Sequence, residues 1–240
     1  MQKEKLGVLV SYKDRPEHLE VFIPYFNYFM ETTHPDIDYQ IYIIEQANDK
    51  PFNKGIIFNA GFDLTNKYYD YLTLHDIDML PISANYYYNS QSYHLPSNIY
   101  NQHTNGRLDE FYTNKIGTFN GGVIVIDNEQ YNQCNGHSNN YWGWGSVDDD
   151  FALRLSSLKK PLINRCLKIE HNIILLGYYV TLHHDDVRFD DEPFNDINLE
   201  RLKNMNSNKL DFKKDGLSSL KYKLLNTEDK KEYIKYSIDF

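Results

Sequence analysis

The N-terminal third of the sequence alternates short apolar runs with longer amphipathic ones, and this alternation limits the folds open to the chain more than any other feature. Residues 5–12 (KLGVLVSY) and 38–46 (DYQIYIIEQ) read as buried strands, and residues 69–78 (YDYLTLHDID) as a third strand that runs into acidic residues. Residues 15–33 and 53–67 carry apolar side chains at helical spacing. This order predicts an α/β fold with a mostly parallel central sheet flanked by helices, and such sheets bind ligands at the carboxyl ends of their strands.

The rest of the chain departs from this pattern. The alternation breaks between residues 80 and 117, in a stretch rich in Tyr, Asn and Ser that is long enough to form the wall or lid of a site. Residues 121–127 (GGVIVID) resume as a strand, and residues 215–226 and 231–240 alternate enough to form two late strands. A chain of 240 residues with 41% hydrophobic residues can bury one sizeable core, so we expect a single domain.

Composition narrows the classes of partner. The 34 acidic and 25 basic residues give a net charge of −9, which argues against nucleic acid and anionic membranes because both repel an acidic surface. No apolar run reaches the roughly 18 residues that span a bilayer, and the apolar stretch near the N-terminus is too short for a signal peptide, so we expect a cytoplasmic protein without a transmembrane segment. Cys134 and Cys166 lack the spacing of a zinc site and are compatible with free thiols or with one disulfide.

Residues 139–151 (NNYWGWGSVDDDF) place two tryptophans among glycines and then three aspartates in a row. Adjacent carboxylates repel one another, and a Trp-Gly-Trp-Gly run makes a poor helix or strand, so a ligand site is the better explanation of both features. The alternative is a surface loop followed by a helix, whose positive N-terminal end favours Asp148, Asp149 and Asp150.

Two further pairs of side chains have the chemistry of metal ligands. Asp76 and Asp78 end the third predicted strand two residues apart, so in an extended chain they point to the same side and suit a hard divalent cation that also binds a diphosphate. His183 and His184 follow another apolar run, and imidazole beside carboxylates suits manganese better than magnesium. The alternatives are capped aspartates at a strand end and a histidine pair on an acidic surface loop.

Five motifs together resemble the β-1,4-galactosyltransferase family. They are FNKGIIFNAGF, HDIDMLP, FNGGVIVI, NNYWGWGSVDDDF and DGLSSLKYKLL, in the family's order and approximate spacing, preceded by SYKDRPEHL. The W-G-W-G run followed by acids is highly specific, whereas a D-x-D alone is not. The resemblance implies a single GT-A domain over residues 1–240, with a nucleotide-binding half (1–80) and an acceptor and metal-completing half (118–240). It also implies inverting transfer from UDP-galactose with Mn²⁺ to a glycan or glycoside acceptor.

The family's metal and donor residues carry over by position. Asp78 resembles the metal-binding aspartate and His184 the histidine ligand, and His183 is the neighbour able to serve as a third ligand. The residues that the resemblance assigns to the donor are Tyr12, Lys13, Arg15, Phe52, Lys54, Asp76, Phe119, Gly122 and Trp144. Among these positions the family often has Phe and Arg, and a Lys in place of Arg keeps the charge but loses the bidentate fork, which predicts lower donor affinity.

The resemblance also assigns the catalytic base and the acceptor site. Asp148 matches the proposed base, and Trp144, Gly145, Asp148 and Asp149 would face the acceptor, with Trp144 closing over the donor once donor and metal are bound. Val147 stands where many members have Glu, and this departure predicts an acceptor other than the family's usual terminal N-acetylglucosamine.

Phe119 stands where the family tends to have Tyr for galactose donors or smaller residues for N-acetylgalactosamine, which leaves the donor open to UDP-N-acetylgalactosamine or UDP-glucose. A binding module that stacks sugars on Trp142 and Trp144 without chemistry is a second alternative. A two-carboxylate glycoside hydrolase ranks last, because consecutive aspartates on one loop do not face each other across a glycosidic bond.

Overall fold

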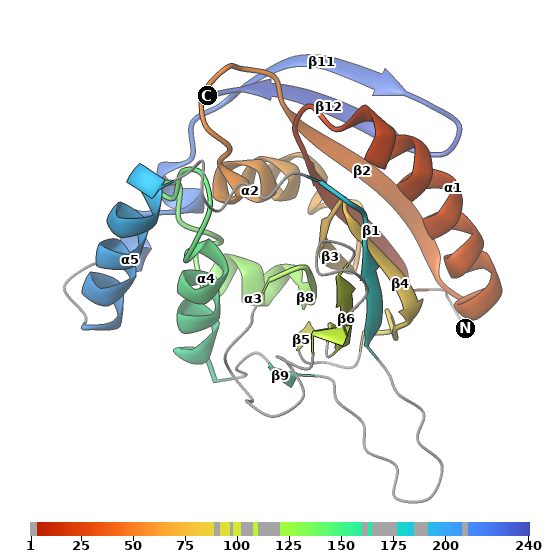
Figure 1. The fold of residues 1–240 in the computed structure, drawn as a ribbon, viewed down its shortest axis with the longest axis horizontal. Coiled ribbons are helices and arrows are strands. Elements are labelled where there is room, and N and C mark those ends of the chain that lie inside the picture. Colours follow the sequence, from red (N-terminus) through yellow and green to blue (C-terminus); the bar gives the residue numbers. More distant parts are fainter. Residues whose placement is uncertain are drawn as a thin grey trace, which may run out of the picture.

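The computed structural model describes residues 4–88, 92–96, 98–101, 108–109, 121–159, 163–164, 177–184, 192–207 and 211–240 (Figure 1). The strands are β1 (Lys5–Tyr12), β2 (Asp38–Gln46), β3 (Tyr71–Asp76), β4 (Met79–Ser83), β5 (Tyr93–His94), β6 (Asn98–Asn101), β7 (Leu108–Asp109), β8 (Val123–Asp127), β9 (Ile163–Asn164), β10 (Tyr178–Thr181), β11 (Lys223–Asp229) and β12 (Ile234–Asp239). The helices are α1 (Pro16–Thr33), α2 (Lys54–Thr65), α3 (Asn128–Gln133), α4 (Val147–Ser156), α5 (Glu192–Asn206) and the 3₁₀ turns η3 (Phe212–Lys214) and η4 (Leu217–Ser219).

The centre of the main sheet is parallel. β1 lies between β2 and β3 and pairs with both in parallel, so that Ser11 at the end of β1 is opposite Asp76 at the end of β3. This confirms the predicted strand, helix, strand, helix, strand order of the N-terminal third. The carboxyl ends of the three strands therefore meet at one edge of the sheet, where ligand sites of α/β folds lie.

The parallel centre of the main sheet is flanked by strands from later in the chain, β11 and β12 on one side and β8, β5 and β9 on the other. The eight strands of this sheet have the order β11-β12-β2-β1-β3-β8-β5-β9. β12 pairs in parallel with β2, whereas β8 is antiparallel to both β3 and β5, and β11 is antiparallel to β12. The fold class is the predicted one, but the sheet is mixed around its parallel centre. The predicted strands over 121–127 and 231–240 are β8 and β12, and the one over 215–226 starts only at Lys223 because η4 precedes it. The boundaries 1–80 and 118–240 of the two halves stay a prediction.

A second sheet has the strand order β4-β10-β6-β7. β4 begins three residues after β3 ends, so the expected loss of regular structure from residue 80 is wrong for the residues of β4. β10 is antiparallel to β4, and the Leu182 N–H donates to the Asp78 carbonyl at 2.7 Å. This pairing brings the segment after β10, which holds both predicted histidines, beside the turn between β3 and β4.

α1 and α2 cover opposite faces of the main sheet (Figure 1). Successive side chains of a strand point to opposite faces, so Val8 of β1 packs in one core with Phe26 of α1. Leu9 packs in the other core with Phe58 of α2. Fully burying a side chain of this size contributes about 1.5–3 kcal/mol, and the two helices thereby fix the strand ends that they follow and precede.

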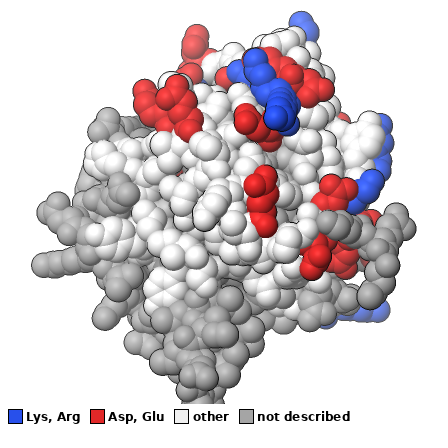
Figure 2. All heavy atoms as spheres, turned by 90° about the vertical axis from the view of Figure 1, so that its right-hand side faces the viewer, with Lys and Arg blue, Asp and Glu red and all other residues white. Residues whose placement is uncertain are grey.

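On the face that Figure 2 shows, acidic and basic side chains lie mainly toward the upper and right-hand margins, around a broad uncharged area. None of the described helices combines the length and apolar character needed to cross a membrane.

Candidate active site

One lysine joins carboxylates from two different parts of the fold. Lys54 is the first residue of α2, and its Nζ lies 2.9 Å from Asp76 of β3 and 3.0 Å from Asp148 of α4. Asp76 also accepts a hydrogen bond from the Ser11 hydroxyl at 3.3 Å. The ends of β1 and β3 and the N-termini of α2 and α4 therefore meet at the predicted edge of the sheet.

Burial and charge act against each other in this group. Only 11% of the Lys54 side chain is exposed, and although burial alone would lower its pKa, Asp148 and Asp76 raise the pKa well above its ordinary value. Burial raises the pKa of Asp76 to about 6, with Lys54 opposing and Asp148 reinforcing the shift. Lys54 is therefore a permanent cation that partly offsets two carboxylates.

A second charged group lies around Asp78. Asp78 is in the two-residue turn between β3 and β4, with its Oδ2 3.1 Å from His184 Nε2 and 4.0 Å from the Arg15 guanidinium. Burial opposes ionisation, but the His184 hydrogen bond and Arg15 hold the pKa of Asp78 below its ordinary value. The turn shows that Asp76 and Asp78 do not share a side through an extended strand, because the strand ends at Asp76. They contact different partners at the same edge.

The predicted third metal ligand, His183, does not join this pair. Its side chain is exposed, and within the described ranges no three His, Cys, Asp or Glu side chains lie close enough to share an ion. Adjacent residues leaving a strand point in different directions, which explains why His184 reaches Asp78 and His183 does not. Instead, the His183 carbonyl accepts a hydrogen bond at 2.9 Å from Nε2 of His18, a residue of α1 that sequence reasoning missed.

The Trp-Gly-Trp-Gly segment is a loop held from two sides. Gly143 and Gly145 have φ of 62° and 104°, which favours glycine, and the Gly143 N–H donates to the Phe52 carbonyl at 2.8 Å. From α5, the buried Asn198 amide donates to the carbonyls of Trp142 (2.9 Å) and Trp144 (3.0 Å). The Trp144 side chain is 45% exposed, so its backbone is held while the indole remains accessible.

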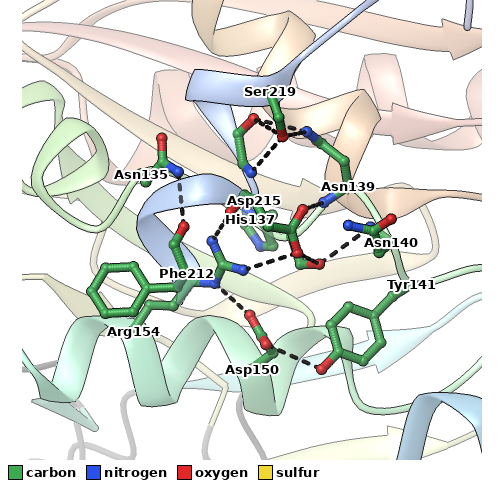
Figure 3. Close-up of polar contacts among 12 residues, drawn as sticks. Asn135, His137, Asn139, Asn140, Tyr141, Asp150, Arg154, Phe212, Asp215 and Ser219 are labelled. Atoms are coloured by element: carbon green, nitrogen blue, oxygen red, sulfur yellow. Dashed lines mark hydrogen bonds and ion pairs between the residues drawn. The ribbon is translucent and has the colours of Figure 1, made fainter. Parts of the chain in front are cut away.

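The third aspartate of the run has a structural role. Asp150 pairs with Arg154 one turn later on α4 and accepts a hydrogen bond from the Tyr141 hydroxyl at 3.1 Å (Figure 3). Arg154, which is 1% exposed, also lies 3.5 Å from Asp215, whose carboxylate accepts the Asn139 N–H at 3.0 Å. This network connects α4 and the start of the aromatic loop to the segment before β11. It thereby holds in place the helix that carries Asp148.

The structure places the other predicted residues as follows. Tyr12 ends β1 and is buried, Lys13 Nζ donates to the Lys50 carbonyl, and Phe52 lies partly buried just before α2. The Gly122 carbonyl accepts the Asp76 N–H at 2.9 Å, so Gly122 is beside the charged group. Asp149 is half-buried on α4. Phe119 and Cys166 lie outside the described residues, and Cys134 is buried as a free thiol.

Sequence reasoning missed three residues of this region: Ser11, His18 and Asn198. Ser11 could have been found, because it ends a predicted parallel strand at the same edge as Asp76. His18 lies within the SYKDRPEHL segment, but no spacing rule marks it, and Asn198 lies on a helix far from the motifs in sequence.

Comparison with solved structures identifies the fold. The catalytic domain of Drosophila β-1,4-galactosyltransferase 7, solved in complex with xylobiose, superposes with a TM-score of 0.75 at 25% identity over 98% of this chain and 93% of that one. A mutant of that enzyme, solved with manganese, UDP-Gal and xylobiose, gives the same TM-score and identity. Mannosyl-3-phosphoglycerate synthase from Rubrobacter xylanophilus shares the fold alone, with a TM-score of 0.54 at 10% identity over 98% and 86% of the two chains. The fold is therefore that of the GT-A glycosyltransferases.

Comparison of sequences narrows this class to a family. One family model, described as the N-terminal region of glycosyl transferase group 7, matches residues 1–91, and another, described as the N-terminal domain of galactosyltransferase, matches residues 106–185. Human β-1,4-galactosyltransferase 4 is 30% identical over 99% of this chain and 64% of its own length. Drosophila melanogaster β-1,4-galactosyltransferase 7 is 34% identical over 63% of this chain and 44% of its own. The chain belongs to the β-1,4-galactosyltransferase family, and it spans 64% of the human relative's length.

Proposed function

We propose that the protein is an inverting glycosyltransferase that moves galactose from UDP-galactose to a hydroxyl of a glycan or glycoside acceptor, with Mn²⁺ bound. One observation carries the proposal: a carboxylate–imidazole pair suited to a metal and an acid suited to be a base lie at the same edge of a GT-A sheet. Membership of the galactosyltransferase family and the relative solved with manganese and UDP-Gal support the choice of donor and metal.

The donor set at Asp78 and His184 fits a divalent cation. Two ligands at right angles, each about 2.0–2.2 Å from an ion, are separated by about 3 Å, and Asp78 Oδ2 lies 3.1 Å from His184 Nε2. One oxygen and one nitrogen ligand leave most of the coordination sphere to a diphosphate and water. When bound, such a cation stabilises the negative charge that develops on the departing diphosphate. Arg15, 4.0 Å from Asp78, adds a second positive charge at the same place.

In this proposal Asp148 acts as the base. An inverting transfer needs a group opposite the departing diphosphate that takes the proton of the attacking hydroxyl. Asp148 is the second residue of α4, where the helix dipole favours a carboxylate, and it directly follows the aromatic loop. Its carboxylate would accept the proton as the acceptor oxygen forms the new bond to the sugar, and correct placement would supply much of its effect.

The exposed Trp144 indole supports a sugar as the acceptor. The apolar face of a hexose packs on an aromatic ring, and polar groups at the rim fix its orientation. The backbone of Trp144 is held by Asn198, so the ring has a defined starting position three residues before Val147, the first residue of the helix that carries Asp148.

The test is transfer itself. We expect product from UDP-galactose with Mn²⁺ across a panel of glycoside acceptors, with a β configuration of the new linkage by NMR, and loss of turnover in chelator or in D78A. D36A is the matched control, because Asp36 is exposed in the turn before β2, at the opposite edge of the sheet. UDP-N-acetylgalactosamine and UDP-glucose in the same panel test the alternative donors. Full turnover in chelator, or glycan binding without any affinity for UDP and Mn²⁺, would overturn the proposal, and the second result would favour a binding module.

A further inference from the structure

Asp148 depends on Lys54 for its place. Among the described residues, the polar contacts of the Asp148 carboxylate all go to Lys54 Nζ, at 3.0 Å from Oδ1 and 3.2 Å from Oδ2. Asp150, by contrast, is held by both Arg154 and Tyr141, and Asp76 has the Ser11 hydroxyl besides Lys54. Removing Lys54 would therefore take away every described polar partner of the Asp148 carboxylate, whereas Asp76 and Asp150 would each keep a partner.

The backbone around Lys54 is fixed with little tolerance. Asn53 caps α2 by accepting the Ile56 N–H at 2.9 Å, and its amide donates to the Asn139 carbonyl at 2.9 Å. At Gly55, a Cβ atom would lie 2.0 Å from the Ser138 carbonyl oxygen, so only glycine allows α2 to start this close to the segment that leads into the aromatic loop. The start of the helix that carries Lys54 is therefore fixed by its contacts with Ser138 and Asn139, which lie in the segment that leads to Asp148.

We propose that Lys54 is the positioning residue of the base: it holds the Asp148 carboxylate in place, directed toward the end of β3, in addition to any contact with the donor. This inference rests on the proposed function, in which Asp148 takes the acceptor proton. An ammonium presents three N–H donors, so one side chain can serve carboxylates from two elements at once. Because Lys54 is buried, its attraction for both is screened less than that of a surface lysine.

A double-mutant cycle tests the proposal. If Lys54 acts through Asp148, K54M lowers kcat about tenfold or more in the wild-type background but less than about threefold in the D148N background. A donor-binding role alone would raise the KM for UDP-sugar equally in both backgrounds and leave kcat at saturation unchanged. K54R, which keeps the charge, should restore most of the kcat lost in K54M. K54Q serves as a second neutral variant if K54M does not fold.

Lys235 provides a matched control. It also bridges two carboxylates, Glu228 at 2.9 Å and Glu45 at 3.4 Å, but on β12 near the sheet edge, and K235M should leave kcat within about twofold of the wild type. An equal loss of kcat from K54M in both backgrounds overturns the proposal.

A structural readout separates this failure from a failure of the proposed function. In a crystal structure of K54M the Asp148 carboxylate should leave the position that it keeps in K54R. An unmoved Asp148 in K54M overturns the positioning role even if the wild type transfers sugar. A wild type without any transfer overturns the proposed function, whatever the position of Asp148.

Discussion

Three adjacent aspartates would repel one another if their side chains shared one space, and the structure separates at least two of them. Successive residues of an α-helix are turned by about 100°, so residues two apart face nearly opposite sides. Asp148 faces Lys54, whereas Asp150 faces Arg154 and Tyr141. The sequence supported Asp148 as the base through a family resemblance, but its partner could not be predicted, because Lys54 precedes it by 94 residues and only the tertiary fold joins them.

Because Asp148 and Asp150 have different partners, isosteric substitutions of these two residues should have different effects. D148N should lower turnover about a hundredfold or more and leave the affinity for UDP and Mn²⁺ within a few-fold, because an amide cannot take the proton. D150N should instead lower the free energy of unfolding by roughly 3 kcal/mol, because it weakens a buried ion pair. Steady-state kinetics, titration calorimetry and denaturant unfolding separate the two effects. If D149N is the severe kinetic lesion and D148N is not, Asp148 is not the base.

His18 provides a prediction about the metal. It is 8% exposed, donates to the backbone beside His184, and has a buried Nδ1 for which the described part of the chain supplies no partner. H18F removes the hydrogen bond that holds the His183–His184 backbone, and we expect about tenfold weaker Mn²⁺ binding in the presence of UDP, as for other residues behind a metal ligand. H18Q keeps a donor and should bind within about threefold of the wild type. Electron paramagnetic resonance of free Mn²⁺ measures both, and equal affinity in H18F and the wild type would contradict the role.

At the scale of elements, local patterns predicted the first five elements well and the rest less so. β1, β2 and β3 are short, nearly continuous apolar runs, and α1 and α2 are longer segments with apolar side chains at helical spacing. The antiparallel β8 and the insertion of β12 beside β2 are pairings between distant segments, on which periodicity carries no information. β4 was missed because it follows β3 after a two-residue turn and contains a proline, which weakens a strand pattern.

Asn198 couples two elements, and its removal should show in both. It is 1% exposed and serves two carbonyls of the aromatic loop from α5, so N198A leaves two acceptors without their donor. We expect the free energy of unfolding to fall by about 1–3 kcal/mol and the loop to become more sensitive to protease. N198D should be worse, because a carboxylate repels the carbonyls that the amide served. L199A on the exposed side of α5 is the control. Unchanged protease sensitivity in N198D would show that the loop does not depend on α5.

At the scale of the whole molecule, the interior behind the site contains a buried histidine that stays neutral. His75 Nδ1 donates to the Asp76 carbonyl at 2.8 Å, so its Nε2 accepts from the Tyr86 hydroxyl at 3.0 Å. The ring also packs edge-on against Phe22 and Phe26 of α1. Burial lowers the pKa of His75 to about 4 from an ordinary value of 6.5. The His75 ring can donate one of these hydrogen bonds and accept the other only when it is neutral. In this form it links the core to the end of β3.

The lowered pKa of His75 predicts that the free energy of unfolding falls as the pH decreases from 6.5 to about 4. A histidine whose pKa is lower in the folded state stabilises the fold fully above pH 6.5, and this contribution is lost as the pH falls toward 4. A difference of about 2.5 pKa units corresponds to roughly 3 kcal/mol in the free energy of unfolding. Denaturant unfolding of wild type and H75Q between pH 4 and 7 measures it: H75Q should be less stable at pH 7 but lose less stability on acidification. Parallel pH profiles for the two proteins would contradict the assignment.

The position of β12 has a consequence for how the chain matures during synthesis. β12 pairs with β2, and Lys235 and Glu45, which contact each other across this pair, are 190 residues apart. The parallel centre of β1, β2 and β3 can assemble early on the ribosome, but the outer edge of β2 stays open until residues 234–239 have emerged. An open apolar strand edge attracts other strands. The newly made chain therefore carries an exposed, aggregation-prone edge of β2 from the synthesis of this strand until β12 has emerged and paired with it.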